Sequence, residues 1–261
     1  ILVIKMSSLG DIILSTAALR ALRKNLGTKF RIICLSGEDS KEALLTCPYI
    51  DDLLVCDLKN RDRGFFGLWR LGRQLRKRNI DIVLDLQNNR KSHILSFLSW
   101  APRRIGYRNN KFGFLLTQGI PDDKAALDPV SHQFRLLKML GIESEDKSLE
   151  IWPTAKDEAY VNEFINSQWI NVNQKICGIN ISASKRWPSK NWPLAYLVKF
   201  CDALGLRDIR VIVTGTQQDR EEANKLSGLV KNTKIINACG RTSVNQLACL
   251  ISRCNGFISC D

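Results

Sequence analysis

The chain has 261 residues, of which 44% are hydrophobic and 25% charged, a balance typical of a soluble globular protein with a sizeable core. Its nine cysteines are scattered without a C-x-x-C pair, which favours reduced thiols over a disulfide framework. No apolar run reaches the roughly 18–20 residues of a membrane span, and no signal peptide is visible. The net charge of +13 predicts a polyanionic partner: nucleic acid, anionic lipid headgroups or phosphorylated sugars.

The chain opens with a pattern typical of a strand, a tight loop and a helix. An apolar run at 1–4 ends at Lys5, small residues follow at 7–10, and Asp11 opens a helical pattern that continues to residue 25. Small residues let the backbone approach a ligand closely, and a helix start offers N–H groups to an anion. In open α/β sheets ligands bind where such loops leave the strands. We therefore expect a ligand site here.

Strand-like and helix-like segments then alternate through the first half of the chain. The predicted strands cover residues 30–35, 53–56, 80–84 and 104–107. The predicted helices cover residues 41–46, 65–78, 91–100 and 131–140. The helix at 65–78 is basic and amphipathic, and Gly141 takes the expected C-cap position after the last helix.

A polar segment at 143–158, containing Pro153, has no clear periodicity and is predicted to link two domains, 1–150 and 151–261. The alternation then restarts. Strands are predicted at 175–181, 209–214, 234–237 and 256–259, and helices at 158–168, 193–204, 219–230 and 243–253. Repeated βα units predict parallel sheets with helices on both faces, hence two doubly wound domains with a cleft between them. Because the chain stops just after a strand-like run, we expect a longer protein to continue beyond it.

Asp11 has two possible roles. An Asp that follows Gly at a helix start is a common N-cap, and position alone favours this interpretation. A carboxylate at the lip of a cleft could instead act as a general base toward a hydroxyl, kept ionised by the helix N-terminus. The loop is not G-x-G-x-x-G, and no G-x-x-x-x-G-K-[ST] occurs, so neither a dinucleotide fingerprint nor a P-loop is present.

Three loops of the second half could bind a nucleotide. Residues 182–193, SASKRWPSKNWP, could cradle a diphosphate with N–H groups and a lysine, or form a basic loop whose tryptophans pack between domains. Asp219 could accept hydrogen bonds from a ribose, or only compensate a helix dipole. Residues 239–243, CGRTS, could lie at an adenine edge, and Asp261 lies where the last strand ends.

Basic segments concentrate in the first half of the chain, at 59–63, 70–78, 90–91 and 103–111. Most charge runs are solvated faces, but several at strand ends would bind an anionic acceptor or rest on an anionic membrane. His93 and His132 are expected to pack or cap rather than to bind a ligand. No Cys/His cluster has zinc spacing and no D-x-D occurs, so no metal site is predicted.

Several motifs stand in one order along the chain. They are KMSSLGDIILSTAALR at 5–20, DIVLDLQ at 81–87, a single His at 132, KNWP at 190–193, TGxxxD at 214–219, GRTS at 240–243 and ISCD at the end. In this set the chain resembles glycosyltransferase family 9, the ADP-heptose:lipopolysaccharide heptosyltransferases. Each motif is short, but the ordered set is specific and covers essentially the whole chain.

The resemblance implies an α/β GT-B fold, in which two Rossmann-like domains face each other across a cleft, here with a truncated second domain. It also implies inverting sugar transfer without a metal or other cofactor. Asp11 would take the acceptor proton, and Lys190 would stabilise the departing diphosphate, with Lys185 as the competing match. The other implied donor contacts are Ser182, Ser184, Lys185, Asp219, Gly240, Arg241, Thr242 and Asp261. The implied acceptor contacts are Ser8, Gly10, Arg61, Arg63 and Gln87.

The leading hypothesis is therefore an enzyme that moves heptose from ADP-heptose to the Kdo or heptose inner core of lipopolysaccharide in a Gram-negative cell. It would be a cytoplasmic monomer in peripheral contact with the inner membrane, with an anionic lipid A–Kdo acceptor and no nucleic acid partner. One alternative is a GT-B transferase that uses another nucleotide sugar. Another is a non-catalytic, basic nucleic-acid-binding Rossmann-like protein, which the absence of RNP-type or helix-turn-helix motifs disfavours.

Overall fold

The computed structural model describes residues 1–122, 127–168, 174–181, 183 and 188–260. The chain divides into two compact units, Ile1–Trp152 and Pro153–Asp261. This division falls two residues beyond the boundary expected after residue 150. We call them unit 1 and unit 2 and describe each by itself.

Unit 1 is built on a six-stranded parallel sheet of order β3-β2-β1-β4-β5-β6. Its strands are β1 (Leu2–Ile4), β2 (Ile33–Gly37), β3 (Asp52–Cys56), β4 (Ile82–Asp85), β5 (Arg103–Arg108) and β6 (Gln118–Pro121). The central strand β1 pairs through Val3 with Cys34 on one side and Leu84 on the other. Because helices cover both faces of such a sheet, the strand is apolar throughout and fully buried.

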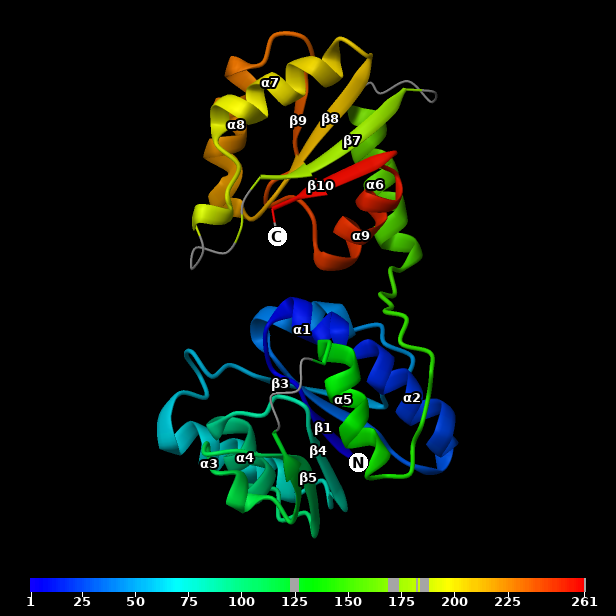
Figure 1. Ribbon diagram of the computed structural model, residues 1–261, viewed down its shortest axis with the longest axis vertical. Helices are drawn as coiled ribbons and strands as arrows, with labels where there is room; N and C mark the ends of the chain where they lie inside the picture. The colour runs from blue at the N-terminus through cyan, green and yellow to red at the C-terminus, as the bar shows by residue number, and fades with distance from the viewer. Residues whose placement is uncertain (123–126, 169–173, 182, 184–187, 261) are drawn as a thin grey trace. The chain divides into compact units, whose positions relative to one another are not determined.

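Helices pack on both faces of the unit 1 sheet (Figure 1). They are α1 (Leu9–Leu14), α2 (Thr16–Leu26), α3 (Gly64–Arg76), α4 (Arg90–Leu98) and α5 (Pro129–Lys138), with 3-10 turns η1 (Gly27–Lys29), η2 (Glu38–Leu44) and η3 (Gly113–Leu115). Helices α3 and α4 contact each other, and α2 contacts α5. Leu71 and Leu75 of α3 and Leu95 of α4 share one hydrophobic cluster with Leu2 and Ile4 of β1.

Unit 2 has a four-stranded parallel sheet of order β10-β7-β8-β9. Its elements are α6 (Ala155–Ser167), β7 (Lys175–Asn180), η4 (Pro188–Lys190), α7 (Leu194–Gly205), β8 (Ile209–Thr214), η5 (Gln217–Asp219), α8 (Arg220–Leu229), β9 (Ile235–Asn237), α9 (Val244–Ser252) and β10 (Gly256–Ser259). Leu197 of α7 and Leu226 of α8 belong to one hydrophobic cluster, and Phe164 of α6 and Leu250 of α9 to a second. The two clusters cover opposite faces of the sheet (Figure 1).

The predicted α/β class, with two doubly wound parallel-sheet domains, is confirmed. Three helix predictions were wrong in bounds or type. The helix predicted from residue 11 to 25 begins at Leu9 and is divided at Ser15, whose hydroxyl donates to the carbonyl of Ile12 at 2.6 Å. The helix predicted at 41–46 is the 3-10 turn η2. Helix α6 begins inside the predicted linker, because Thr154 and Asp157 form a capping box there.

Strand β6 was missed because it has no apolar run: it is a short, half-exposed edge strand that ends in Pro121. Within the described residues, none of the helices is both long enough and apolar enough to cross a bilayer.

Candidate active site

The first candidate site lies where the strand order of unit 1 reverses. From β1 the chain runs outward through β2, and from β4 it runs outward in the opposite direction, so a crevice forms at the carboxyl ends of β1 and β4. Gln87 connects the two loops there. Its Oε1 accepts hydrogen bonds from the backbone N–H groups of Met6 (2.7 Å) and Ser7 (3.0 Å). Gln87, an expected acceptor contact, thus holds the loop that follows β1 in place.

Asp11 lies beside this crevice as the third residue of α1. Its Oδ2 accepts hydrogen bonds from the backbone N–H and the hydroxyl of Ser8, each at 2.9 Å, and its Oδ1 lies 3.6 Å from the Nζ of Lys5. The predicted N-cap position was wrong: Ser8 is the N-cap residue, and Asp11 completes the capping box from inside the helix. The Asp11 side chain remains 44% exposed, so its carboxylate is open to a ligand.

Lys5 supplies a positive charge to this carboxylate. Its side chain is only 9% exposed, and its Nζ lies 3.4 Å from the carbonyl oxygen of Leu86. Burial lowers the pKa of Lys5, against the opposing effect of Asp11 and Asp85. Burial also acts to raise the pKa of Asp11, but the hydrogen bonds from Ser8 and the charge of Lys5 outweigh it and leave this pKa below its usual value. Asp11 is therefore ionised at neutral pH and able to accept a proton.

A cavity of about 610 Å³ opens beside Ser7, at the carboxyl ends of the first four strands. Its basic lining residues are Lys59, Arg90, Lys91 and Lys111. These four side chains were not among the predicted site residues, although their basic segments follow predicted strands. Lys59 forms an ion pair with Asp39, which also lines the cavity. The acidic residues Glu38, Asp39 and Asp57 lie in the same lining, so the basic side chains outnumber the acidic ones by one. A cavity of this size suits a carbohydrate-sized ligand.

Arg61 and Arg63 line a different groove, which shares no lining residue with the cavity beside Ser7. Asp62, whose side chain is buried, organises this loop. Its Oδ2 accepts hydrogen bonds from the backbone N–H of Asp57 (2.8 Å) and from Arg61 Nη2 (3.0 Å), and its Oδ1 accepts one from Arg70 Nη2 (2.5 Å).

Gly10, also an expected acceptor contact, is exposed, and a methyl group in place of its hydrogen would meet no atom within 4 Å.

The two histidines pack against neighbours, as expected. His132 stacks on the ring of Tyr107 with centroids 3.8 Å apart, and its Nε2 lies 3.4 Å from an oxygen of Asp122. His93 is fully buried, with its Nδ1 2.8 Å from an oxygen of Asp85. In the part of the chain that the structure describes, no group of three or more His, Cys, Asp or Glu side chains could hold a metal ion.

The second candidate site lies at the carboxyl edge of the unit 2 sheet. The loops after β8 and β9 meet there, since the N–H of Gly240 donates to the carbonyl of Gly215 at 3.0 Å. Gly240 has φ +67°, and a Cβ at this position would lie 2.7 Å from the Cα of Gln217. Glycine is thus required for both backbone conformation and close approach. The next residue, Arg241, accepts a hydrogen bond from the hydroxyl of Tyr160 through its carbonyl (2.6 Å), and Thr242 follows on the same loop.

Asp219 ends η5, next to this pair of loops. Its Oδ2 accepts hydrogen bonds from the backbone N–H and the hydroxyl of Thr216, both at 2.6 Å. This is a capping box, so the helix-start role considered for Asp219 is present. These bonds engage one carboxylate oxygen, and the second can face a ligand.

The loop after β7 lies where the strand order of unit 2 reverses, because β8 and β10 flank β7 on opposite sides. Lys190 is exposed at the end of η4, just before Pro193 and α7. Asn191 supports this loop by accepting a hydrogen bond from the N–H of Ala183 at 2.8 Å. The remaining predicted donor contacts, Ser182, Ser184, Lys185 and Asp261, lie outside the described residues.

Known proteins match this chain over most of its length. A family model described as glycosyltransferase family 9 (heptosyltransferase) matches residues 68–261. The lipopolysaccharide core heptosyltransferase OpsX of Haemophilus influenzae is 22% identical over 264 residues, which cover 99% of this chain and 72% of the relative.

Solved structures agree with this match. A glycosyl transferase family 9 protein of Veillonella parvula is 26% identical, with a TM-score of 0.89 over 99% of this chain and 74% of its own. The E. coli ADP-heptose lps heptosyltransferase II, 20% identical, has the same fold, with a TM-score of 0.75 over 100% of this chain and 78% of its own. The two Rossmann-like units of the chain are those of the GT-B fold class.

Proposed function

The chain belongs to glycosyltransferase family 9, and from this premise we propose that it transfers heptose from ADP-heptose to the Kdo or heptose inner core of lipopolysaccharide. The observation that carries this proposal is the ionised carboxylate of Asp11, held beside a basic cavity where the strand order reverses. The family match begins at residue 68, so the role of Asp11 rests on geometry and on motif resemblance.

In the proposed reaction an acceptor hydroxyl attacks the anomeric carbon of the donor sugar and inverts it. A carbon–oxygen bond forms to the acceptor as the bond to the β-phosphate of ADP breaks. Asp11 takes the hydroxyl proton, and we assign its Oδ1 as the receiving atom, because Ser8 occupies Oδ2. The positive charge of Lys5 keeps the carboxylate ready for this step.

On the donor side, the departing ADP gains negative charge that must be stabilised. We assign this task to the ammonium of Lys190, with N–H groups of its loop, so that transfer needs no metal or other cofactor. Asp219 would bind the ribose, and Gly240, Arg241 and Thr242 would face the adenine. Support comes from the joined loops after β8 and β9, which lie at one sheet edge.

On the acceptor side, the cavity beside Ser7 offers four basic side chains to the carboxylates and phosphates of a lipid A–Kdo acceptor. Ser8 and Gln87 lie on the loops of this crevice, Gly10 lies in the first turn of α1, and Arg61 and Arg63 would extend the contact along the neighbouring groove. An acceptor of this kind is embedded in a membrane. The protein would therefore act in peripheral contact with the cytosolic face of the inner membrane. We further propose that it acts as a monomer, without nucleic acid.

Substitution of Asp11 tests the base assignment. Asp11→Ala should abolish turnover, with kcat lowered by about 10²- to 10⁴-fold or more. The variant should stay folded and bind ADP normally. Asp11→Asn separates the two roles of the residue, because an amide oxygen can still accept the Ser8 hydrogen bonds but cannot take a proton. Ser8→Ala removes the hydroxyl partner but leaves the backbone N–H of Ser8 on Oδ2, so it measures the loss of one capping hydrogen bond apart from the loss of the base. A near-normal rate in either Asp11 variant would exclude this residue as the base.

A second candidate function is transfer of a different nucleotide-activated sugar by the same fold. Of the two solved structures described above, the Veillonella protein is more similar to this chain, and its name specifies no sugar. This similarity favours keeping the second candidate. Calorimetric titration with ADP-heptose, ADP-glucose, UDP-glucose and GDP-mannose would decide. Tight binding of ADP-heptose alone supports heptosyl transfer, whereas preference for another donor reassigns the substrate.

A further inference from the structure

The outer face of α3 is an unusual surface for a water-exposed helix. Between residues 63 and 78 the chain has six Lys or Arg residues, three aromatic residues and no acidic residue. We define the α3 outer face as the exposed side chains of Phe65, Phe66, Trp69, Arg73 and Lys77. Trp69, Arg73 and Lys77 follow the adjacent Phe65 and Phe66 at spacings of three to four residues, which places them along one side of the helix.

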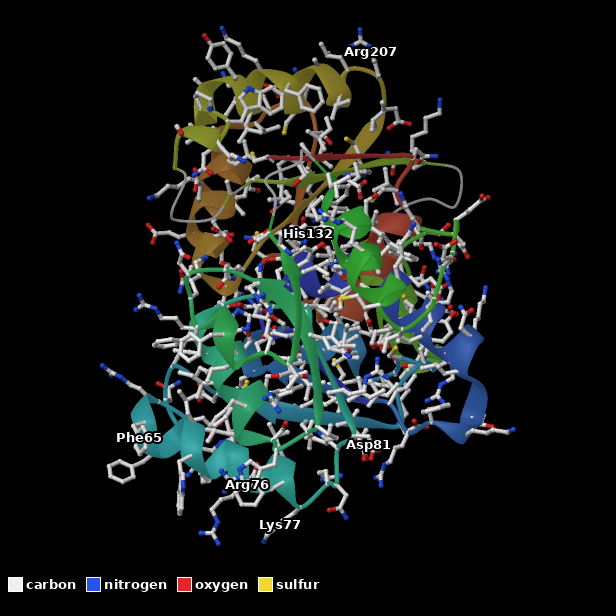
Figure 2. The ribbon with its side chains drawn as sticks, turned by 60° about the horizontal axis from the view of Figure 1, so that its bottom comes forward. Phe65, Arg76, Lys77, Asp81, His132 and Arg207 are labelled. Carbon is white, nitrogen blue, oxygen red and sulfur yellow. The ribbon has the colours of Figure 1, made fainter. Side chains whose placement is uncertain are left out.

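This face is separate from the side of α3 that packs into the core. Leu71 and Leu75 are buried against the sheet, while Phe65 and Phe66 are 77% and 82% exposed. The two phenyl rings meet edge to face with centroids 5.9 Å apart. In Figure 2, Phe65 projects outward from the start of the helix, and Lys77 projects from its other end. Core packing therefore leaves two large apolar rings in water, a cost that a partner surface would remove.

A second aromatic and basic pair extends the surface toward α4. The guanidinium carbon of Arg76 lies 3.9 Å from the ring centroid of Trp100, an exposed residue just beyond α4. Arg76 is itself held by a hydrogen bond from its Nε to the carbonyl of Leu98 at 2.8 Å. The exposed rings thus come from two neighbouring helices rather than from one frayed helix end.

The basic side chains of this face are available to anions. They line a groove of about 560 Å³ that also contains Phe66 and Trp69. Asp62 pairs with Arg61 and Arg70. Across the residues that the structure describes, no carboxylate lies within ion-pair distance of Arg63, Arg73 or Lys77. These cations have no competing carboxylate, although Arg73 stacks on Trp69, and they can meet the phosphates of a ligand.

We propose that the α3 outer face docks on an anionic lipid bilayer, with Phe65 and Phe66 entering the headgroup region and Arg73 and Lys77 meeting lipid phosphates. Arginine or lysine beside protruding aromatic residues is the composition of interfacial membrane helices. This inference rests on the peripheral membrane contact proposed above and names the surface that makes it.

A single-stranded nucleic acid fits this surface less well. Such a ligand needs ring faces on which bases can stack. The face of Trp69 is covered by the guanidinium of Arg73, 4.9 Å from the ring centroid, and the two phenyl rings form an edge-to-face pair rather than parallel platforms.

Vesicle sedimentation tests the proposal without donor, acceptor or turnover, so its outcome is independent of the transfer reaction. The protein should bind vesicles of phosphatidylglycerol and phosphatidylethanolamine but not vesicles of phosphatidylcholine alone. Phe65→Ala with Phe66→Ala should weaken binding roughly tenfold. Arg73→Gln with Lys77→Gln should weaken it by about fivefold for each charge removed at low salt, an effect that 0.5 M salt should largely erase.

The matched controls lie in unit 2. Leu206 is 76% exposed, and the adjacent Arg207 is also exposed (Figure 2). Leu206→Ala with Arg207→Gln therefore removes one apolar and one basic side chain elsewhere and should leave vesicle binding unchanged. All variants carry substitutions at exposed positions, and circular dichroism checks that they fold.

Three results would each overturn the proposal, the first two arising in the vesicle experiment itself. One is failure of the wild-type protein to bind anionic vesicles, and another is an equal loss in the unit 2 control. The third is a loss of poly(U) RNA binding in the α3 variants while vesicle binding stays intact, which would assign the face to nucleic acid.

Discussion

At the scale of single residues, Asp11 combines a structural and a chemical task in one side chain. One carboxylate oxygen completes the cap of α1 with Ser8, and the other faces Lys5. The cap fixes the orientation of the carboxylate, so the oxygen offered to a substrate is held without a dedicated second residue. Removing the side chain would cost α1 about 1 kcal/mol of capping energy as well as the proposed base.

Lys5 should control the pH at which Asp11 works. The charge of Lys5 lowers the pKa of Asp11, so replacing it by the apolar Lys5→Met should raise that pKa. A base acts only when deprotonated, so the acidic limb of the kcat/KM profile should move to higher pH. We express each rate as a fraction of the same protein's rate at pH 8. On the acidic limb this fraction should be roughly three- to tenfold smaller for the variant than for the wild type.

The control for this prediction is Lys24→Met, which removes a lysine that is exposed on α2 and lies 3.8 Å from an oxygen of Asp146. Its acidic limb should match the wild type. An unchanged profile in Lys5→Met would show that Lys5 serves the fold alone.

At the scale of elements, the packing of α3 against α4 depends on Gly72. A Cβ at this position would lie 2.6 Å from the Cβ of Leu98, so the helices approach too closely for any larger residue. Gly72→Ala should reduce the free energy of unfolding by about 1–3 kcal/mol through overpacking. Urea denaturation measures this change.

Gly228→Ala is the matched helical control, because a Cβ there meets no atom within 4 Å. It should stabilise the protein by up to about 1 kcal/mol, since alanine favours a helix more than glycine does. Equal effects of the two substitutions would contradict the close packing of α3 and α4.

The bounds of elements with regularly spaced apolar residues were predictable from sequence. The bounds of elements that begin at polar capping residues were less predictable. Strands β8 and β10 have the bounds predicted for them. The starts of α1 and α6 were placed too late, because both follow capping boxes whose first residue, Ser8 or Thr154, lies outside the apolar period. Such starts depend on hydrogen bonds, which hydrophobic patterning does not report.

At the scale of the whole molecule, strand order determines which loops become sites. The βα alternation predicted two parallel sheets, but it did not specify that β1 lies beside β4, or β7 beside β10. The link from Gln87 to the loop after β1, and the cavity lined from four strand ends, follow from that order. The lining lysines and Arg90 were visible only as basic segments, because their convergence is a property of the sheet.

The proposed assignment, with the donor bound by unit 2 and the acceptor by unit 1, predicts which backbone amides a bound nucleotide protects from hydrogen exchange. At an ADP concentration near 100 times its Kd, binding stabilises the bound unit by about 2.7 kcal/mol. Amides in unit 2 at 189–191, 214–219 and 238–243 that open only when ADP leaves should then exchange up to about a hundredfold more slowly. The unit 1 loops at 5–8 and 86–91 should exchange as before, because ADP without an acceptor gives them no contact in the proposed assignment.

Hydrogen exchange with mass spectrometry reports both units in one experiment, and Gly240→Ala supplies the matched variant. Its added Cβ would lie 2.7 Å from the Cα of Gln217, so the joined loops must separate and ADP protection should fall. Vesicle binding through α3 should persist in the same variant, since α3 belongs to unit 1. Protection that appears first in unit 1 would reverse the donor and acceptor assignments.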